Sequence, residues 1–367
     1  MKTHLMKLML RTLLVLSLIS LLNSTGLARF KDDEGGPRNN THAPQLTVMT
    51  RNLYLGTDFG PILGATSFPE FANAVAAAYI QVEQSNIPER AAAIAREIDS
   101  AQPDLIGLQE ASIWRTGPFG GPANTVTFDA LQSLLDALAA RGLNYAPVVI
   151  ITEFEAEAPS ALGINIRFTD RDVVLARTDL NESELQLSNV QAQHFTTNLM
   201  FINPILGPLT IPRGWISVDG EIRGKRFRFV TAHLESFHPG IQAVQASELI
   251  LGPCNTELPV IIAGDLNTDS PSGDPAQNAG YQIISSSGFS DLWTLLGENE
   301  PGNTWPLHLG DSSTSTTPTQ RIDLILFRGD VRPEDIKLIG KRLTPNTPGG
   351  IWPSDHAGVL ASFKLKR

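Results

Sequence analysis

Cysteine and positive charge are both scarce in this chain of 367 residues. Cys254 is its one cysteine, which excludes an internal disulfide. Lys and Arg number 28 against 38 Asp and Glu, so the net charge of −10 excludes a uniformly basic nucleic-acid-binding surface, although not a locally basic cleft. Hydrophobic residues make up 42% of the chain and charged residues 18%, a composition typical of a globular protein with a sizeable core.

The first 28 residues have the pattern of a secretory signal peptide. Lys2, Lys7 and Arg11 precede an apolar run over residues 12–22, and the small side chains of 23–28 end at Ala28. A transmembrane anchor fits less well, because the apolar run is shorter than the roughly 20 residues that span a bilayer. We therefore expect a secreted or periplasmic protein, cleaved after Ala28, whose net charge falls from −10 to −13 with the loss of three cations.

The rest of the chain is predicted to hold one folded domain. Residues 29–44 lack hydrophobic periodicity, which indicates a flexible leader. Residues 45–367 show neither a break in composition nor a repeat of fixed period. We expect a single domain over this range.

Apolar runs bounded by turn residues predict strands, and apolar residues at helical spacing predict helices. The expected strands are 46–50, 104–108, 148–152, 172–176, 215–218, 227–232, 259–263, 322–327 and 358–363. The expected helices are 71–82, 88–100, 128–140 and 239–251. Strands that alternate with helices early and with hairpins later indicate an α+β protein with a two-layer or sandwich arrangement.

Polar side chains recur where these strands begin and end. If the strands at 322–327 and 358–363 run antiparallel to the others, these side chains meet at one edge, as a catalytic site requires. Taken singly, each such residue is more often a turn, a helix cap or a hydrogen-bonded core residue. The residues concerned are Asn52, Glu110, His233, Asp265, Asn267, Asp323, Asp355 and His356.

The motifs of several other enzyme classes are missing from the sequence. There is no Cys/His cluster for zinc and no His-Glu-x-x-His. Gly-x-Ser-x-Gly and Gly-x-x-x-x-Gly-Lys-[Ser/Thr] are also absent, which disfavours serine hydrolases and P-loop enzymes.

Six short motifs, in a fixed order, resemble a known enzyme family. They are Asn-Leu at 52, Leu-Gln-Glu ending at 110, Thr-Ala-His-Leu around 233, Gly-Asp-Leu-Asn at 264–267, Arg-Ile-Asp ending at 323 and Ser-Asp-His ending at 356. Together they resemble the endonuclease/exonuclease/phosphatase superfamily. The resemblance implies a DNase I-like fold, a four-layer α/β/β/α sandwich of two mixed β-sheets flanked by helices.

The resemblance also implies a metal site and a water-activating carboxylate. Glu110, Asp355 and Asn52 match the positions that hold a divalent cation, Mg²⁺ or Mn²⁺, and carboxylate oxygens are the ligands such ions prefer. The metal would neutralise charge on the phosphoryl oxygen and on the leaving group. Asp265 matches the residue that orients and deprotonates the attacking water, while Asn267 and Asn52 would hold the phosphate.

Two histidines complete the catalytic set that the resemblance implies. His356 would contact the phosphate, and Asp323 would fix its tautomer by accepting a hydrogen bond from the other ring nitrogen. His233 would stabilise the transition state or protonate the leaving oxygen. The alternative for His356 and Asp323 is a buried pair without a catalytic role.

Two groups of cations are candidates for phosphate contact. Arg213 lies at the His233 end of a predicted hairpin, where its guanidinium either holds a phosphate oxygen or forms a strand-end ion pair. Residues 223–228 contain four cations around the turn at Gly224. Because that turn lies roughly 26 Å along the strand from His233, we interpret the cluster as a solvated loop.

Residues 54–84 depart from the compact family pattern. This insertion begins two residues after Asn52 and contains the Ala-rich helix at 71–82, so we expect it beside the cleft. Its apolar residues either pack the extra helix or offer apolar surface to a lipid or a base. They are Phe59, Ile62, Leu63 and Phe68.

The predicted function is a secreted, divalent-metal-dependent phosphoesterase that cleaves phosphodiester bonds by metal-assisted attack of water. A DNase I-like nuclease is the first expectation, and a sphingomyelinase-like phospholipase C or an inositol phosphatase is the alternative. A non-catalytic binding module is disfavoured because every polar residue of the motifs is present. The expected partner is a phosphate ester, either nucleic acid or phospholipid; no protein partner is implied, and a monomer is expected.

Overall fold

The computed structural model describes residues 44–366 except 271–274, 298–299, 308–316 and 342–346. The predicted signal peptide and, apart from Pro44, the predicted leader lie outside the described residues. Within the described part of the chain, no helix is long and apolar enough to cross a membrane.

Two large β-sheets form the centre of the fold. The first has the order β15-β16-β1-β2-β6-β3-β4, and β5 also pairs with β6. Its strands are β1 (Gln45–Asn52), β2 (Leu105–Gln109), β3 (Ile113–Pro118), β4 (Thr125–Asp129), β5 (Tyr145–Pro159), β6 (Ile164–Arg177), β15 (Val331–Ile339) and β16 (Gly358–Leu365). Strands β1 and β2 are parallel, whereas β16 runs antiparallel to β1.

The second sheet has the order β13-β14-β12-β11-β10-β7. Its strands are β7 (Gln186–His194), β10 (Gly214–Ile222), β11 (Lys225–Ala232), β12 (Val260–Asp265), β13 (Ser290–Asp291) and β14 (Asp323–Arg328). Strand β14 runs antiparallel to β12, so both antiparallel arrangements on which the predicted site depends are present. A separate two-stranded ribbon pairs β8 (Leu199–Asn203) with β9 (Gly207–Ile211).

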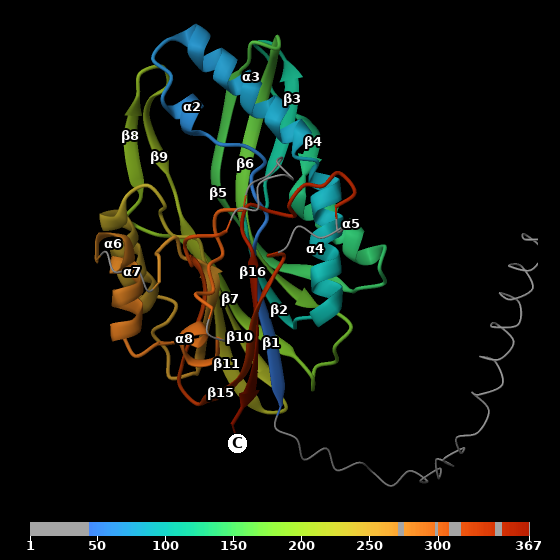
Figure 1. Ribbon diagram of the computed structural model, residues 1–367, viewed down its shortest axis with the longest axis vertical. Coiled ribbons are helices and arrows are strands. Elements are labelled where there is room, and N and C mark those ends of the chain that lie inside the picture. Colours follow the sequence, from blue (N-terminus) through green and yellow to red (C-terminus); the bar gives the residue numbers. More distant parts are fainter. Residues whose placement is uncertain (1–43, 271–274, 298–299, 308–316, 342–346, 367) are drawn as a thin grey trace, which may run out of the picture. The chain divides into compact units, whose positions relative to one another are not determined.

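Helices cover the outer face of each sheet (Figure 1). The helices α3, α4 and α5 pack an apolar layer against the first sheet, and α6 and α7 do so against the second. The helices are α2 (Gly60–Leu63), α3 (Phe68–Gln84), α4 (Ile87–Ala101), α5 (Ala130–Ala139), α6 (Pro239–Leu251), α7 (Pro275–Ser286) and α8 (Leu292–Leu296). The result is the predicted α/β/β/α sandwich.

The inner faces of the two sheets pack directly on each other. Val174 and Val48 from the first sheet and Phe229 and Ile261 from the second belong to one fully buried cluster, as alternation along strands with one face inward predicts. The sheets approach closely at Gly107 in β2, where a Cβ atom would lie 2.4 Å from the hydroxyl of a residue in β11. Only glycine fits there.

Two predictions need correction, one about a helix boundary and one about burial. The helix expected at 128–140 begins at Ala130, because residues Thr125–Asp129 pair as β4 with β3. Arg228, assigned to a solvated loop, is buried and donates to both carboxylate oxygens of Asp219 at 2.6 and 3.1 Å. Its neighbours at the turn remain exposed or half-buried.

The insertion packs against the first sheet rather than forming an exposed apolar patch. The ring of Phe59 stacks on Trp114, with centroids 6.0 Å apart, and contacts Phe168 at 4.7 Å. Ile62 also packs against this core, while Phe68 is exposed at the start of α3. Ile62 thus has the structural role of the two alternatives, whereas Phe59 and Leu63 also line the cleft described below, so neither alternative is excluded for them.

Candidate active site

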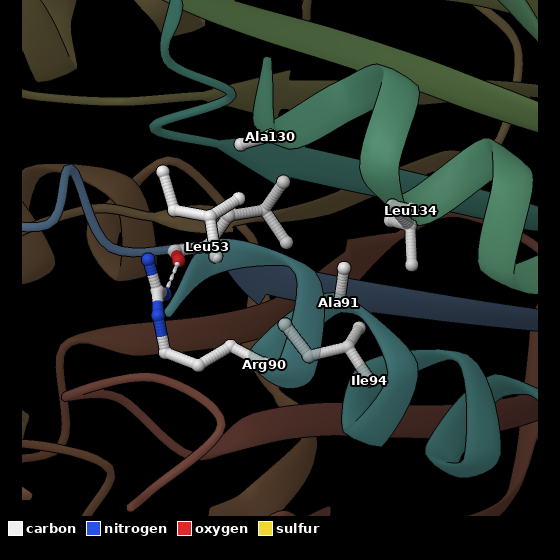
Figure 2. A pocket seen from close by; sticks show the side chains of 7 residues that line it. Leu53, Arg90, Ala91, Ile94, Ala130 and Leu134 are labelled. Atoms are coloured by element: carbon white, nitrogen blue, oxygen red, sulfur yellow. Dashed lines mark hydrogen bonds between the residues drawn. The ribbon is translucent and has the colours of Figure 1, made fainter. Parts of the chain in front are cut away.

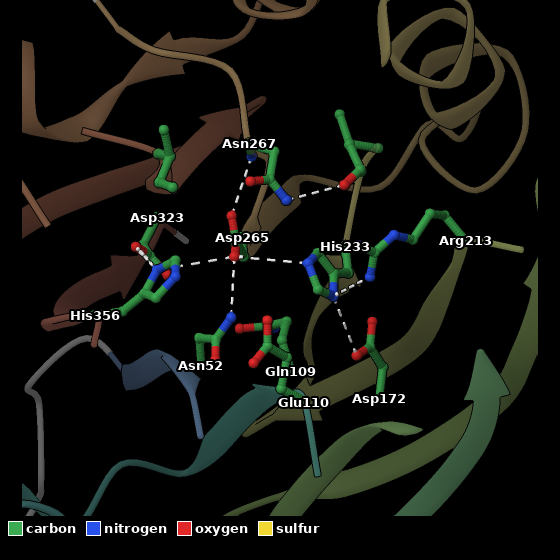
Figure 3. A network of polar contacts seen from close by, with 12 residues as sticks. Asn52, Gln109, Glu110, Asp172, Arg213, His233, Asp265, Asn267, Asp323 and His356 are labelled. Carbon is green, nitrogen blue, oxygen red and sulfur yellow. Dashed lines mark hydrogen bonds and ion pairs between the residues drawn. The ribbon is translucent and has the colours of Figure 1, made fainter. Parts of the chain in front are cut away.

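Strands from both sheets deliver their polar ends to one place (Figure 3). Asn52 ends β1 and Glu110 follows β2 in the first sheet. His233 follows β11 and Asp265 ends β12 in the second. Because β14 and β16 run in the opposite direction, their starts bring Asp323, Asp355 and His356 to the same edge.

Asp265 is the centre of this network. Its Oδ1 accepts a hydrogen bond from the backbone N–H of Asn267 at 3.1 Å, and its Oδ2 accepts from Asn52 Nδ2 at 3.1 Å. The same Oδ2 lies 3.7 Å from Nε2 of His233 and 3.8 Å from Nδ1 of His356. Burial, together with the nearby charge of Asp323, raises the pKa of Asp265 to about 6.

His356 forms the predicted pair with Asp323. Its Nδ1 lies 2.9 Å from Asp323 Oδ2, which leaves Nε2 as the ring nitrogen for a ligand. Burial opposes a charge on the ring, but the carboxylates of Asp323, Asp355 and Asp265 outweigh it and raise the pKa of His356 well above its usual range. His356 is therefore an imidazolium at neutral pH.

The His233 ring, in contrast to that of His356, is uncharged. Its Nδ1 lies 3.0 Å from Nη1 of Arg213, and because arginine can only donate, this nitrogen accepts and the proton resides on Nε2. Burial and the Arg213 charge lower the pKa of His233 to about 4. His233 is thus a neutral Nε2–H donor directed at Asp265, which favours transition-state stabilisation over protonation of the leaving oxygen.

A buried acidic cluster surrounds Arg213, and the sequence reasoning missed it. Glu153 in β5 and Asp170 and Asp172 in β6 are nearly inaccessible, and Arg213 Nη1 lies 3.7 Å from Asp170. Burial and mutual repulsion raise the pKa of Asp170 to about 8, and burial raises that of Asp172 to about 7. The cluster holds Arg213 against His233. The signal in the sequence was the pair of acids at alternating positions, Asp170 and Asp172, just before the apolar run of β6.

Glu110 and Asp355 fit a divalent cation. Glu110 has the left-handed φ of 58°, which turns its carboxylate out of the strand direction, and its Oε2 accepts from the Leu55 N–H at 2.7 Å. Burial and the charge of Glu110 raise the pKa of Asp355 to about 6, against the opposing effect of His356. Two carboxylates that repel each other in an enclosed site present the hard oxygen atoms that Mg²⁺ or Mn²⁺ binds.

A second group could also hold a cation. The ligand atoms of Asp265, Asp323 and His356 lie within 4.8 Å of one another. However, Nδ1 of His356 is already engaged with Asp323. A cation held there would compete with Asp323 for this ring nitrogen, whereas Glu110 and Asp355 match the metal positions that the sequence motifs predict.

Arg90 fixes the backbone that follows Asn52 (Figure 2). Fully buried in α4, it donates to the carbonyl oxygens of Leu53 at 2.6 Å and Ser85 at 2.9 Å, and its guanidinium lies 5.2 Å from the ring centroid of Tyr54. The cavity beside it measures about 10 Å³, which is at the limit of one water molecule. Arg90 is thus a structural cation, and substrate must bind elsewhere.

The network forms the floor of a cleft of about 740 Å³. This volume is typical of a site for a small molecule or for part of a larger ligand. Its walls include Phe154 and Phe168 from the first sheet, Phe201 and Leu209 from the ribbon, and Trp305. The cleft is therefore polar at its floor and apolar along its walls.

The sequence pattern of the Endonuclease/Exonuclease/phosphatase family matches residues 80–356, well over half of the chain. The chain belongs to this family. Members of the family are divalent-metal-dependent hydrolases of phosphoester bonds. No curated protein matches the sequence.

Solved structures of family members have the same fold. A family protein from Bacteroides thetaiotaomicron is 16% identical, with a TM-score of 0.56 over 89% of this chain and 100% of its own. A mannosyl-6-phosphatase from the same species is 16% identical, with a TM-score of 0.53 over 87% and 99%. A humanized TDP2 of D. rerio is 16% identical, with a TM-score of 0.52 over 87% and 98%. At these identities the similarity establishes the fold alone.

Proposed function

We propose that this family member hydrolyses phosphodiester bonds by attack of a water molecule that Asp265 orients and deprotonates. The proposal rests on two hydrogen bonds that fix the Asp265 carboxylate. The Asn267 backbone N–H donates to one carboxylate oxygen, and Asn52 Nδ2 donates to the other. A fixed carboxylate with a pKa of about 6 is ionised at neutral pH and basic enough to accept a proton.

Glu110 and Asp355 would hold Mg²⁺ or Mn²⁺ beside this carboxylate. When bound, the cation supplies Lewis-acid stabilisation of charge on the phosphoryl and leaving oxygens. The imidazolium of His356 faces the same cleft and donates to a phosphoryl oxygen, since Asp323 keeps its other nitrogen engaged. The neutral His233 donates through Nε2 to a second oxygen.

Bis-p-nitrophenyl phosphate tests this proposal without involving any substrate-recognition surface. The purified chain should hydrolyse it with Mg²⁺ or Mn²⁺ and stop in excess EDTA, and Asp265→Asn should lose at least a hundredfold in turnover. Asp219→Asn is the matched control, because Asp219 is also buried in the second sheet but pairs with Arg228 away from the cleft. A chelator-resistant rate, or equal rates for wild type and Asp265→Asn, would contradict the proposal.

Export is part of the same proposal. Its support is the sequence of residues 1–28, with basic, apolar and small-residue regions in signal-peptide order. N-terminal sequencing of protein from its native host should find a start near residue 29. A cytosolic protein that retains Met1 would exclude export.

A further inference from the structure

The β8–β9 hairpin is apolar on both of its faces. Residues 195–212, which contain it, include no charged side chain. On the inner face, Phe201, Leu209 and Ile211 line the cleft, whereas Met200 and Ile202 on the outer face are 69% and 79% exposed. Charges normally protect exposed strands from unwanted pairing, so their absence here marks a surface with a binding role.

The hairpin is fixed to the active site. At its base, the Thr196 N–H donates to Glu248 of α6 at 2.7 Å, and the backbone N–H of Arg213 donates to Asn198 Oδ1 at 2.9 Å. Near its turn, Asn203 Nδ2 donates to a carbonyl oxygen of α2 at 3.2 Å (Figure 1). The exposed apolar side chains therefore keep a set position relative to His233 and the cleft.

The cleft opens between apolar borders and has few cations. Phe237, in the loop after His233, also lines the cleft and is 66% exposed. Among the described residues of the lining, Arg213 is the one arginine or lysine, and it is enclosed by acids, whereas Asp58 is exposed. A polyanion needs several accessible cations along its backbone. The lining instead fits a ligand with one phosphate and a large apolar part.

We propose that the hairpin seats this enzyme on a lipid bilayer and that its substrate is a zwitterionic phospholipid. The proposal rests on the phosphodiesterase function above. The outer residues Met200 and Ile202 enter the bilayer, and the apolar part of the substrate lies along the inner face of the hairpin with its phosphate at the floor. Water adds to phosphorus and loses a proton to Asp265, while the P–O bond to the leaving alcohol breaks and that oxygen takes up a proton.

The charge distribution of the protein favours a zwitterionic bilayer over an anionic one. The chain carries a net charge of −10, and acids predominate in the cleft lining, so an anionic lipid surface would repel it. Binding to a zwitterionic surface depends on apolar contact alone, and such contact is not screened by salt. The outer face of the hairpin is continuous with the lining of the cleft. This continuity favours a lipid over a protein as the partner, because a lipid substrate can pass from the bilayer beside the outer face into the cleft.

Vesicles of phosphatidylcholine and of sphingomyelin test the proposal by flotation and by release of product phosphate. The double variant Met200→Ser/Ile202→Ser should bind vesicles roughly a hundredfold more weakly, since each fully buried side chain of this size contributes about a factor of ten or more. The ratio of vesicle hydrolysis to bis-p-nitrophenyl phosphate hydrolysis should fall similarly. Binding of the unmodified chain should change little between low and high salt.

A control double variant, Leu251→Ser/Val126→Ser, removes two apolar side chains that are 75% and 53% exposed on α6 and β4, outside the cleft lining. It should bind and hydrolyse vesicles as the unmodified chain does, and thermal unfolding should show that both double variants fold. If the unmodified chain cleaves the soluble diester but ignores vesicles, or acts better on DNA or on a protein-bound phosphoester, the lipid proposal is wrong. If it cleaves neither soluble diester nor lipid, the phosphodiesterase function itself fails.

Discussion

Arg213 controls the protonation of His233, and replacing it should change that protonation measurably. A pKa of about 4 means that about one His233 ring in a thousand carries a proton at pH 7. The difference from the ordinary value of 6.5 corresponds to about 3 kcal/mol, of which burial contributes most and Arg213 the next share. Arg213→Met removes the guanidinium, so we expect the pKa of His233 to rise by more than one unit.

NMR of the histidine ring in the metal-free protein gives this pKa and also the tautomer, through the two ¹⁵N shifts. The unmodified chain should show a neutral ring protonated on Nε2, and Arg213→Lys, which keeps the positive charge, should leave the pKa low. Arg213→Met also leaves the buried acids around it unpaired, which should cost about 3–5 kcal/mol of stability, so the titration is done where the variant is folded. Titration of the unmodified His233 near pH 6.5, or protonation on Nδ1, would refute the reasoning.

Three further predictions concern the metal, the base and the pH dependence of stability. Glu110→Gln should raise the Mg²⁺ concentration needed for half-maximal hydrolysis at least tenfold, and an unchanged Mg²⁺ titration would remove Glu110 from the metal site. Asp265→Asn and His356→Ala should each lower turnover by about 10² to 10⁴ without changing circular dichroism; a wild-type rate would exclude that residue from catalysis. Burial raises the pKa of Asp104 to about 6 in the folded chain, so its contribution to stability is present at low pH and is lost as the pH rises through about 6. Asp104→Asn should therefore be more stable than wild type at pH 8, by at most about 3 kcal/mol, and similar at pH 3.5; equal unfolding temperatures at both pH values would argue against this.

Most strands near the site could be predicted because each is a short apolar run that ends in a polar residue. Both sheets are covered on their two faces, so central strands such as β2 and β12 are apolar along nearly their whole length and easily recognised. The predicted strands placed Asp265, His233 and His356 at one edge and the resemblance supplied their roles; the structure brings both histidine rings to within 3.8 Å of Asp265 Oδ2. The predicted hairpin placed Arg213 at the His233 end, but the hydrogen bond between the two side chains and the buried acids around Arg213 depend on packing that the strand pattern does not show.

Strands β7, β8 and β9 were missed for physical reasons. Strand β7 is largely polar and exposed at a sheet edge, so it lacks the alternation of a half-buried strand. The hairpin of β8 and β9 has apolar residues on both faces, which hides its period of two, and its short strands contain Pro208. From sequence, Phe59 and Ile62 could be assigned to packing or to ligand binding; the structure shows that both pack against the core and that Phe59 also lines the cleft.

The close approach of the two sheets at Gly107 has a consequence for how the site tolerates motion. Asn52, Gln109 and His356 belong to the first sheet, and their partners Asp265, Thr231 and Asp323 belong to the second. A slide of one sheet over the other by a fraction of an ångström would separate Asp265, the proposed proton acceptor, from Glu110 and Asp355, the proposed metal ligands, well before the apolar core lost contact. The enzyme should therefore lose turnover under heat or denaturant earlier than it loses secondary structure. If a cation and a phosphate bind across both sheets as proposed, they should reduce the difference between the two transitions.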